Sequence, residues 1–457
     1  MEHRHKRGSW SSGVAFVMAA AGSAIGLGNL WGFPYKLGAG GGAIFLLFYL
    51  FFVVTVGVVS MLGEITLGRK TGMSAVTAYG TFGKKYKILG YMGIVCGFVI
   101  LSFYSVVASW SIKYFVTYLG KTVGLVQIES AEAFFNSFTS NGLEVIFYHL
   151  IVMAITIAIV MAGVQKGIDK TTSVLMPALF VMLVLLAIRS LTLPGAVDGL
   201  KFMFMPNLET VKEVGLGKIM TSALSQVFFS LSVGMGTMLT YGSYLDKKTN
   251  LVKASMMIPI MDTAAAILAG LVIMPAVFAY DLSPTQGPPL LFIVMSQVFN
   301  SMPMGDILGA VFYLLIIFAA ITSTISILEL ITSFFVDEKK KDRKKSALIS
   351  GIVIALCGIP VALSFGILKD VRLPALNGDW LEILGWYDYV SEYVLMTLGA
   401  LIMCLLIGWV WKPKVVIDEI KISSEFKLEK VWTFLIKYVT PVLIFVTFLT
   451  SAGFIKV

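Results

Sequence analysis

The feature that most constrains this chain is a succession of apolar runs, each long enough to cross a bilayer. A spanning α-helix needs about 20 consecutive apolar residues. Eleven such runs lie at 11–36, 42–68, 88–120, 143–163, 168–189, 217–244, 251–280, 304–335, 347–367, 383–411 and 431–455. Only 13% of the 457 residues are charged, about half the share in soluble proteins. We therefore predict an all-α polytopic membrane protein with eleven transmembrane helices.

The connections between these runs predict the orientation in the membrane. The apolar stretch 286–302 is short and flanked by prolines, so we expect an external re-entrant or surface helix there. Lys and Arg gather in alternate connections, with about 24 on one side and about 10 on the other, and the richer side faces the cytoplasm. We predict a cytoplasmic N-terminus, a C-terminus outside, and a cell-membrane location. This distribution also explains the net charge of +9 without a nucleic-acid partner, and no obligate protein partner is evident.

Two of the spans contain residues that disfavour a continuous helix. The stretches 19–29 in span 1 and 228–236 in span 6 are rich in Gly and Ser, and each Gly costs about 1 kcal/mol relative to Ala inside a helix. An offset of five spans reverses the chain direction. We therefore predict inverted repeats at 1–190 and 191–411, with discontinuous helices 1 and 6, followed by a cytoplasmic loop and helix 11 at 412–457.

A broken helix inside a membrane indicates a binding site. Its unpaired backbone groups cost several kcal/mol each in lipid, so such breaks survive where they line a cavity. Freed N–H groups suit a carboxylate and freed carbonyls suit a cation, so two facing breaks suit a zwitterion with a metal ion. Oxygen ligands suit a hard ion such as sodium; the candidates are Asn29, Ser230, Asp262, Thr322 and Ser323. The sequence shows no Cys/His cluster and no nucleophile–base pattern, so we predict no enzymatic activity.

Three acidic residues lie inside spans, where a charge costs at least about 2.5–3.5 kcal/mol. Asp262 has no basic neighbour in sequence, and either ion coordination or a structural hydrogen-bonded acid would explain it. Glu64 is expected to accept bonds from N–H groups freed by a broken helix. For Glu329, a gating role and a plain interior contact both remain open.

Span 5 contains Gly167 and, ten residues later, Pro177. The proline removes a backbone bond to the carbonyl of Ser173. Either this is an ordinary proline kink, or the cytoplasmic half of the helix can unwind and admit water.

Several motifs together resemble the neurotransmitter:sodium symporter family, and in particular its bacterial eleven-helix hydrophobic amino acid transporters. The likeness extends from Arg7 to about Trp411. Its motifs are 20–35 (AAGSAIGLGNLWGFPY), Glu64 with Gly68-Arg69, Ser102-Phe103-Tyr104, 226–232 (QVFFSLS) and 318–323 (FAAITS). This fold is an established example of discontinuous helices around a site at the bilayer midplane.

The resemblance implies two sodium sites and a substrate site. The first sodium site would use Ala24, Asn29, Ser230, Asp262 and the substrate carboxylate. The second would use Gly22, Ile25, Ala319, Thr322 and Ser323. The implied substrate-binding residues are Ala24, Leu27, Gly28, Ile100, Tyr104, Phe229, Ser230, Ser232, Met235, Ser323, Thr324 and Ile327. The implied gating residues are Arg7, Trp10, Asp337, Ser243, Tyr244, Asp388, Gly167 and Pro177, with Arg7 and Asp337 paired on the cytoplasmic side.

The chain departs from the family pattern at two places. Asp262 stands where animal members have an asparagine and need chloride, so its carboxylate would replace the anion and we expect chloride independence. Gly32 stands where the family has the outer-gate arginine that faces an acid, here matched by Asp388. Lys36, one helical turn later, is a candidate replacement for that arginine.

These observations together predict a sodium-coupled symporter that imports a hydrophobic or aromatic L-amino acid by alternating access. The preference for a large apolar side chain is inferred from three residues, Met235, Ile100 and Ile327. The unbranched side chain of Met235 adapts its shape to a ligand. The alternative is that Met235 only packs against neighbouring helices. A proton-coupled amino acid transporter, or a substrate sensor of the same architecture, remains the second hypothesis.

Overall fold

The computed structural model describes residues 8–284 and 288–455. Within these ranges nine helices are long and apolar enough to span a membrane, or eleven if each sharply bent helix pair counts as one span. The first five spans are built from α2 (Gly13–Ala24) with α3 (Phe33–Ala39), α4 (Ala43–Phe52) with α5 (Val58–Thr71), α7 (Lys87–Thr122), α9 (Gly142–Met161) and α10 (Lys170–Leu191). The other six are built from α13 (Leu216–Leu231) with α14 (Thr237–Gly242), α15 (Leu251–Ala279), α17 (Gly305–Asp337), α18 (Arg343–Ala362), α19 (Ile383–Asp388) with α20 (Thr397–Leu405), and α22 (Glu429–Phe434) with α23 (Thr440–Ser451).

Both predicted interruptions are present. After α2 the chain continues through a π-helical turn at Gly28–Gly32, and the two halves of span 1 are bent by 46°. In span 6, α13 ends at Leu231 and α14 begins at Thr237. Between them Ser232, Gly234 and Gly236 have φ of 52°, 93° and 86°, a left-handed conformation that glycine adopts at little cost.

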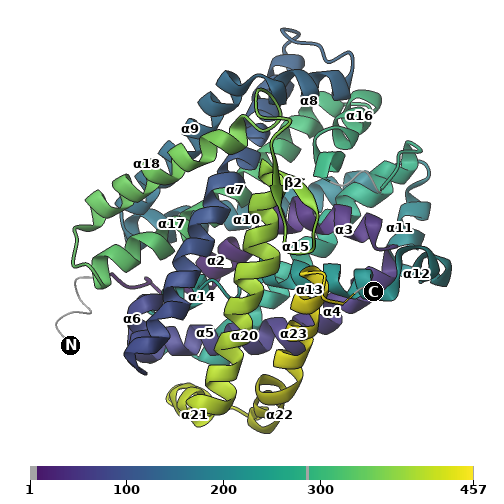
Figure 1. Cartoon of the computed structure of the whole chain (residues 1–457). Helices are drawn as coiled ribbons and strands as arrows, with labels where there is room; N and C mark the ends of the chain where they lie inside the picture. Colours follow the sequence, from purple (N-terminus) through teal and green to yellow (C-terminus); the bar gives the residue numbers. More distant parts are fainter. Residues whose placement is uncertain (1–7, 285–287, 456–457) are drawn as a thin grey trace.

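The spans form a bundle in which the two breaks lie deep inside. α7 and α17 make the most extensive helix contact, and α9 and α18 pack against both (Figure 1). α2 contacts α10, α15 and α17, while α13 packs on α4 and α14 on α5. The broken segments therefore lie between the α7–α17 pair and the rest of the bundle, where lipid does not reach them.

The connections contain more structure than the sequence predicted. They include the short helices α6 (Ala75–Gly80), α8 (Ala131–Ser140), α11 (Ala196–Phe204), α12 (Leu208–Val214), α16 (Val294–Ser301) and α21 (Lys414–Ile420), and a hairpin of β1 (Arg372–Pro374) and β2 (Trp380–Glu382) in which Leu373 pairs with Leu381. Of the two forms predicted for 286–302, a re-entrant segment or a surface helix, the surface helix is wrong. Its described part is a 3₁₀ turn at Pro288–Leu291 followed by α16, and Phe292 and Val298 are fully buried.

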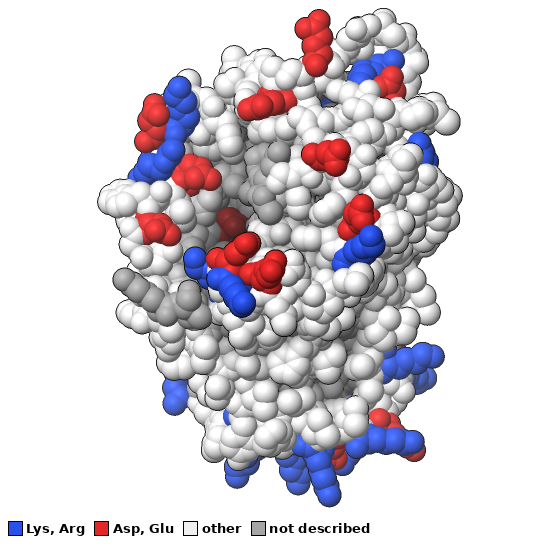
Figure 2. Space-filling model, turned by 90° about the vertical axis from the view of Figure 1, so that its right-hand side faces the viewer, with Lys and Arg blue, Asp and Glu red and all other residues white. Residues whose placement is uncertain are grey.

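Charged side chains separate between the two ends of the bundle. Figure 2 shows Lys and Arg gathered at the lower end, where α21 and α22 lie in Figure 1, whereas acidic residues are prominent in the upper half. Between the charges at mid-height and the basic residues at the bottom, the surface in this view is almost free of charge. This pattern is the one expected of a membrane protein whose basic end faces the cytoplasm.

Candidate functional site

The two breaks face each other across a small cavity of about 20 Å³ whose lining residues are mostly buried. The lining residues come from both breaks, α7 and α17: Ser23, Ala24, Gly26, Gly28, Ile100, Tyr104, Phe229, Ser232, Met235, Ser323 and Ile327. Most of the predicted substrate residues are therefore in one place. Leu27 contributes its backbone, Ser230 turns to Asp262, and Thr324 lies outside the cavity, because its hydroxyl is 2.8 Å from that of Thr156 on α9.

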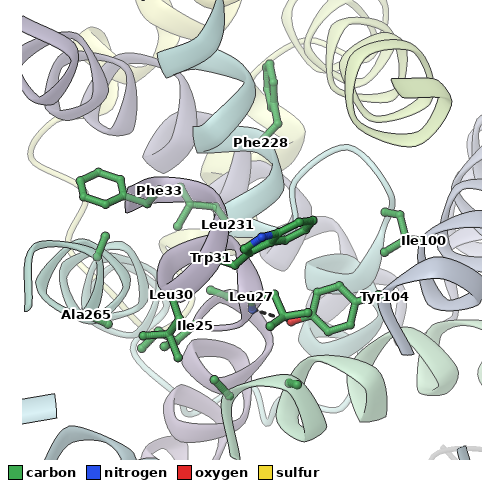
Figure 3. Close-up of a cluster of buried hydrophobic side chains, with 14 of the residues drawn as sticks. Ile25, Leu27, Leu30, Trp31, Phe33, Ile100, Tyr104, Phe228, Leu231 and Ala265 are labelled. Carbon is green, nitrogen blue, oxygen red and sulfur yellow. Dashed lines mark hydrogen bonds between the residues drawn. The ribbon is translucent and has the colours of Figure 1, made fainter. Parts of the chain in front are cut away.

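The backbone at the break of span 1 is held by side chains from other spans. The N–H of Leu27 donates to the Tyr104 hydroxyl at 2.7 Å, and the two groups point toward each other in Figure 3. A Cβ at Gly26 would lie 2.3 Å from the hydroxyl oxygens of both Tyr104 and Ser323. No other residue fits at Gly26 without moving these two hydroxyls, so the close approach explains why the break is rich in glycine.

Asp262 lies at the centre of the first predicted sodium site. Its carboxylate accepts hydrogen bonds from the Asn29 amide at 2.8 Å and from the Ser230 hydroxyl at 2.8 and 2.9 Å. Tyr49 is the third donating residue, with a hydrogen bond of 3.2 Å from its hydroxyl. Tyr49 was missed by the sequence reasoning, because no pattern links it to a residue 213 positions away. Three of the four predicted protein ligands are thus in direct contact around one carboxylate.

The second predicted sodium site also assembles. The Thr322 hydroxyl donates to the Ala319 carbonyl at 2.9 Å, and the Ser323 hydroxyl lies 3.5 Å from the Gly22 carbonyl. Ile25 follows α2 with an extended backbone (φ −78°, ψ 94°), so the helix ends beside these oxygens. The two predicted sodium sites offer hydroxyl, amide and carbonyl oxygens, and at most one carboxylate each. The described residues contain no cluster of three His, Cys, Asp or Glu side chains that could hold a metal ion. Such donors suit a hard monovalent cation.

Two side chains stabilise the breaks through hydrogen bonds to their backbone. The Glu64 carboxylate accepts the N–H of Gly234 at 2.7 Å, which confirms the prediction that Glu64 pairs with a backbone group freed by a broken helix. The Gln226 amide donates to the Gly28 carbonyl at 2.7 Å. Gln226 belongs to a motif singled out in the sequence, but its role was not predicted. Together they tie span 2 to the break of span 6, and span 6 to the break of span 1.

A buried ion pair lies on the outer side of the site. The Lys36 ammonium is 2.5 Å from the Glu392 carboxylate, and the two side chains are 4% and 2% exposed. Lys36 therefore does pair with an acid of span 10, as expected of a replacement for the missing arginine. The bonded partner is Glu392, one helical turn after the expected Asp388.

Aromatic and charged side chains close the opposite side. The Trp10 indole donates to the Tyr241 carbonyl at 3.0 Å, and its ring contacts that of Tyr244. The Tyr244 hydroxyl bonds to Glu329 at 2.5 Å, and Glu329 forms an ion pair with Arg343 at 2.5 Å. Glu329 is therefore part of a charged network and not a plain interior contact.

Two other predicted gating residues, Asp337 and Ser243, are described, whereas a third is not. Arg7 lies outside the described residues, so its predicted pairing with Asp337 stays a prediction. The carboxylate of Asp337 accepts the N–H of Ser74 at 2.6 Å. The Ser243 hydroxyl donates to the Thr240 carbonyl at 2.6 Å, which caps the end of α14.

Span 5 begins with an irregular turn. Residues Val164–Asp169 form a π-helical turn, and Pro177 lies within α10 after it. A Cβ at Gly167 would lie 2.0 Å from the Ile159 carbonyl oxygen, so only glycine fits there. The Asp169 carboxylate accepts the N–H of Ser11 at 3.0 Å. The start of span 5 is therefore bonded to the chain just before α2.

Comparisons with known proteins agree with this geometry. The model of the sodium:neurotransmitter symporter family matches residues 7–131 and 130–456. The chain is 37% identical over 452 residues to the sodium-dependent transporter YhdH of Bacillus subtilis, covering 98% of each chain. It is 25% identical over 499 residues to a sodium-dependent dopamine transporter of Caenorhabditis elegans, covering 94% of this chain and 77% of that one.

A solved structure matches nearly the whole fold. The crystal structure of MhsT in complex with L-phenylalanine has a TM-score of 0.90 and 39% sequence identity, and the match covers 97% of this chain and 100% of that chain. The helical fold with nine to eleven spans thus agrees with a family match that extends over almost the full length. The chain is a sodium-dependent symporter that belongs to the sodium:neurotransmitter symporter family.

Proposed function

We propose that this protein couples two sodium ions to the import of a hydrophobic or aromatic L-amino acid, without chloride, in the cell membrane. The observation that carries the proposal is the cavity between the two breaks, with Tyr104, backbone groups and two sets of oxygen ligands around it. The phenylalanine named with the similar MhsT structure supports the substrate class.

The chemistry of the cavity supports a zwitterion with an apolar side chain. Polar groups lie at one end, where Tyr104 and the amides near Leu27 and Gly28 would hold the carboxylate. Ile100, Met235 and Ile327 form the apolar wall. The space of about 20 Å³ is far smaller than an amino acid, so binding requires these side chains to move apart. Met235 changes shape readily, which is consistent with a pocket that expands around its substrate.

Chloride independence is supported by the position of Asp262. Its carboxylate is fully buried and contacts two predicted sodium ligands, Asn29 and Ser230. A fixed negative charge at this place offsets the charge of the ion, which is the role a chloride ion would otherwise have. A proton could occupy the same carboxylate, and this is the basis of the alternative, proton-coupled transport.

Barriers on both sides of the cavity support a mechanism of alternating access. The Lys36–Glu392 pair lies outside it, and Trp10 with the Tyr244–Glu329–Arg343 network lies on the other side. One charge crossing 100 mV releases about 2.3 kcal/mol, and a tenfold sodium gradient adds about 1.4 kcal/mol per ion. Two ions together supply about 7 kcal/mol, enough for about 10⁵-fold accumulation of a neutral zwitterion.

Uptake by proteoliposomes tests the proposal. Radiolabelled phenylalanine or leucine should accumulate when sodium is outside, and replacement of sodium by choline at constant pH should abolish accumulation. Unlabelled Leu, Phe, Trp and Tyr should compete, whereas Gly and Asp should not. Uptake that follows a pH gradient and ignores sodium would establish the proton-coupled alternative instead, and binding without counterflow would indicate a sensor.

A further inference from the structure

A second, larger cavity lies at the basic end of the protein, outside the site described above. It is a groove of about 640 Å³ between the start of α2, the connection from α14 to α15, and the first turns of α15. None of the residues that line the substrate cavity lines this groove. Among its lining residues Trp10 belongs to the barrier described above and Ser11 is bonded to the start of span 5, but Lys248, Lys253 and the apolar wall have no role in the mechanism of transport.

The groove changes from polar to apolar along its length. Its polar rim includes Lys248 and Lys253, which are exposed and form no ion pair within the described part of the chain. Its apolar wall includes Val14, Val17 and Met257, and the side chain of Val14 is 67% exposed. An amphipathic groove at the edge of the bilayer matches a ligand that has a charged head and a hydrocarbon tail.

The rim is positively charged. Two lysines stand against the single carboxylate of Asp246, which accepts the backbone N–H of Lys248 at 3.0 Å. Two helices also begin there, α2 capped by Ser12 and the 29-residue α15 capped by Asn250. Helix N-termini carry partial positive charge and favour anions. The lysines and the helix ends therefore select an anionic head group.

One wall of the groove is held rigid by a fully buried arginine. Arg69 at the end of α5 donates to the Thr249 carbonyl at 2.9 Å and to the Ser423 hydroxyl at 2.7 Å, and forms an ion pair with Glu419 on α21 at 2.9 Å. Lys247 pairs with the same Glu419 at 2.5 Å. The connection that presents Lys248 is thus fixed in place before any ligand arrives, which lowers the entropy cost of binding.

We propose that this groove binds one anionic phospholipid from the cytoplasmic leaflet. The phosphate lies between Lys248 and Lys253, and the acyl chains lie along Val14, Val17 and Met257. Basic residues close to the cytoplasmic leaflet attract anionic lipid head groups electrostatically. The basic segment at residues 1–7 fits poorly as the occupant, because it would bring Arg4, Lys6 and Arg7 against the two lysines.

The bound lipid would contact α2 and α15 together. It would therefore strengthen the packing of the half-helix that precedes the break of span 1. This binding does not depend on which amino acid is carried or on which ion drives transport, so it can be tested on the purified protein without an uptake assay.

Thermal unfolding of the full-length protein in detergent, after removal of native lipid, provides the test. We expect phosphatidylglycerol to raise the unfolding midpoint and phosphatidylcholine with the same acyl chains to leave it unchanged. Lys248→Glu with Lys253→Glu should weaken the response, so that the half-saturating phosphatidylglycerol concentration rises at least tenfold. Lys344→Glu with Lys345→Glu is the matched control, because it reverses two exposed lysines in the first turn of α18 and should respond like the unaltered protein.

A second variant tests the groove without changing its charge. Met257→Trp fills the apolar wall and should also abolish the response to phosphatidylglycerol. Equal stabilisation by both lipids, or an undiminished response in the Lys248/Lys253 variant, would overturn the proposal. If inorganic phosphate raises the unfolding midpoint equally, the groove is a site for free anions and not for a lipid. If phosphatidylglycerol raises the midpoint only after deletion of residues 2–7, this segment occupies the groove.

Discussion

Replacement of Lys36 by methionine should destabilise the closed state of the protein strongly. The Lys36 ammonium lies 2.5 Å from Glu392, and both side chains are almost completely buried. Methionine keeps most of the side-chain length but leaves the Glu392 carboxylate without its cation. Removal of one partner from a buried ion pair costs about 3–5 kcal/mol. At 1.4 kcal/mol per factor of ten, this corresponds to a decrease of about 10²- to 4 × 10³-fold in the ratio of folded to unfolded protein.

The matched variant is the double replacement Lys36→Met with Glu392→Met. It removes both charges, and replacement of a whole buried pair by apolar residues is often neutral or stabilising. We therefore expect the double variant to recover most of the lost stability. Lys201→Met is the control for an exposed pair, since Lys201 and Asp198 are 59% and 65% exposed and such pairs contribute about 0–1 kcal/mol.

Chemical unfolding in detergent, with sodium and amino acid present, measures these differences in unfolding free energy. Substrate affinity and its sodium dependence should be measured on the same samples, because a pair that closes the outer side affects both. The reasoning fails if Lys36→Met keeps the affinity, sodium dependence and stability of the unaltered protein. It also fails if the double variant is as unstable as the single one, because the pair would then not be coupled.

Three further predictions concern the site and its inner barrier. Uptake should continue in chloride-free buffer, and Asp262→Asn should make it depend on added chloride; a variant indifferent to chloride would contradict the assignment. Glu64→Ala leaves the N–H of Gly234 without its acceptor and should lower the unfolding free energy by about 1–3 kcal/mol, whereas an unchanged midpoint would show that water replaces the carboxylate. Arg343→Met leaves Glu329 without its cation and should lower the unfolding midpoint, but by less than Lys36→Met, because Arg343 is 21% exposed; an equal or larger decrease would contradict this ranking.

The sequence was sufficient for features that depend on local composition. Long apolar runs predicted the spans, because lipid requires each backbone group to be paired within its own helix. Glycine and serine clusters predicted the two breaks. Glu64 was assigned correctly because an acid in lipid needs donors, and a broken helix is the nearest source of unpaired N–H groups.

Pairings between distant spans could not be derived from one sequence. Lys36 was identified as a candidate, but its bonded partner is Glu392 rather than Asp388. The two acids are one turn apart on the same helix face, so only the packing of span 10 decides between them. The position of Thr324 could not be predicted for the same reason. A small rotation of α17 about its axis decides whether this side chain faces the cavity or, as in the structure, α9.

The buried contacts of Arg69 were also beyond sequence reasoning. Arg69 belongs to a recognised motif, yet its partner Glu419 lies 350 residues later in the loop before the last span. Nothing in the local pattern around either residue indicates the other. Such long-range ion pairs depend on how whole spans are arranged, and this arrangement is known only from the three-dimensional fold.

In the proposed transport cycle, the bond between Ser11 and Asp169 couples two parts of the chain that would both move for release into the cell. The N–H of Ser11 is 3.0 Å from the Asp169 carboxylate, at the end of the π-helical turn that opens span 5. If that turn unravels, the entrance to span 1 loses its anchor at the same moment. Departure of the half-helix and entry of water would then be a single event, and neither could proceed halfway without the other.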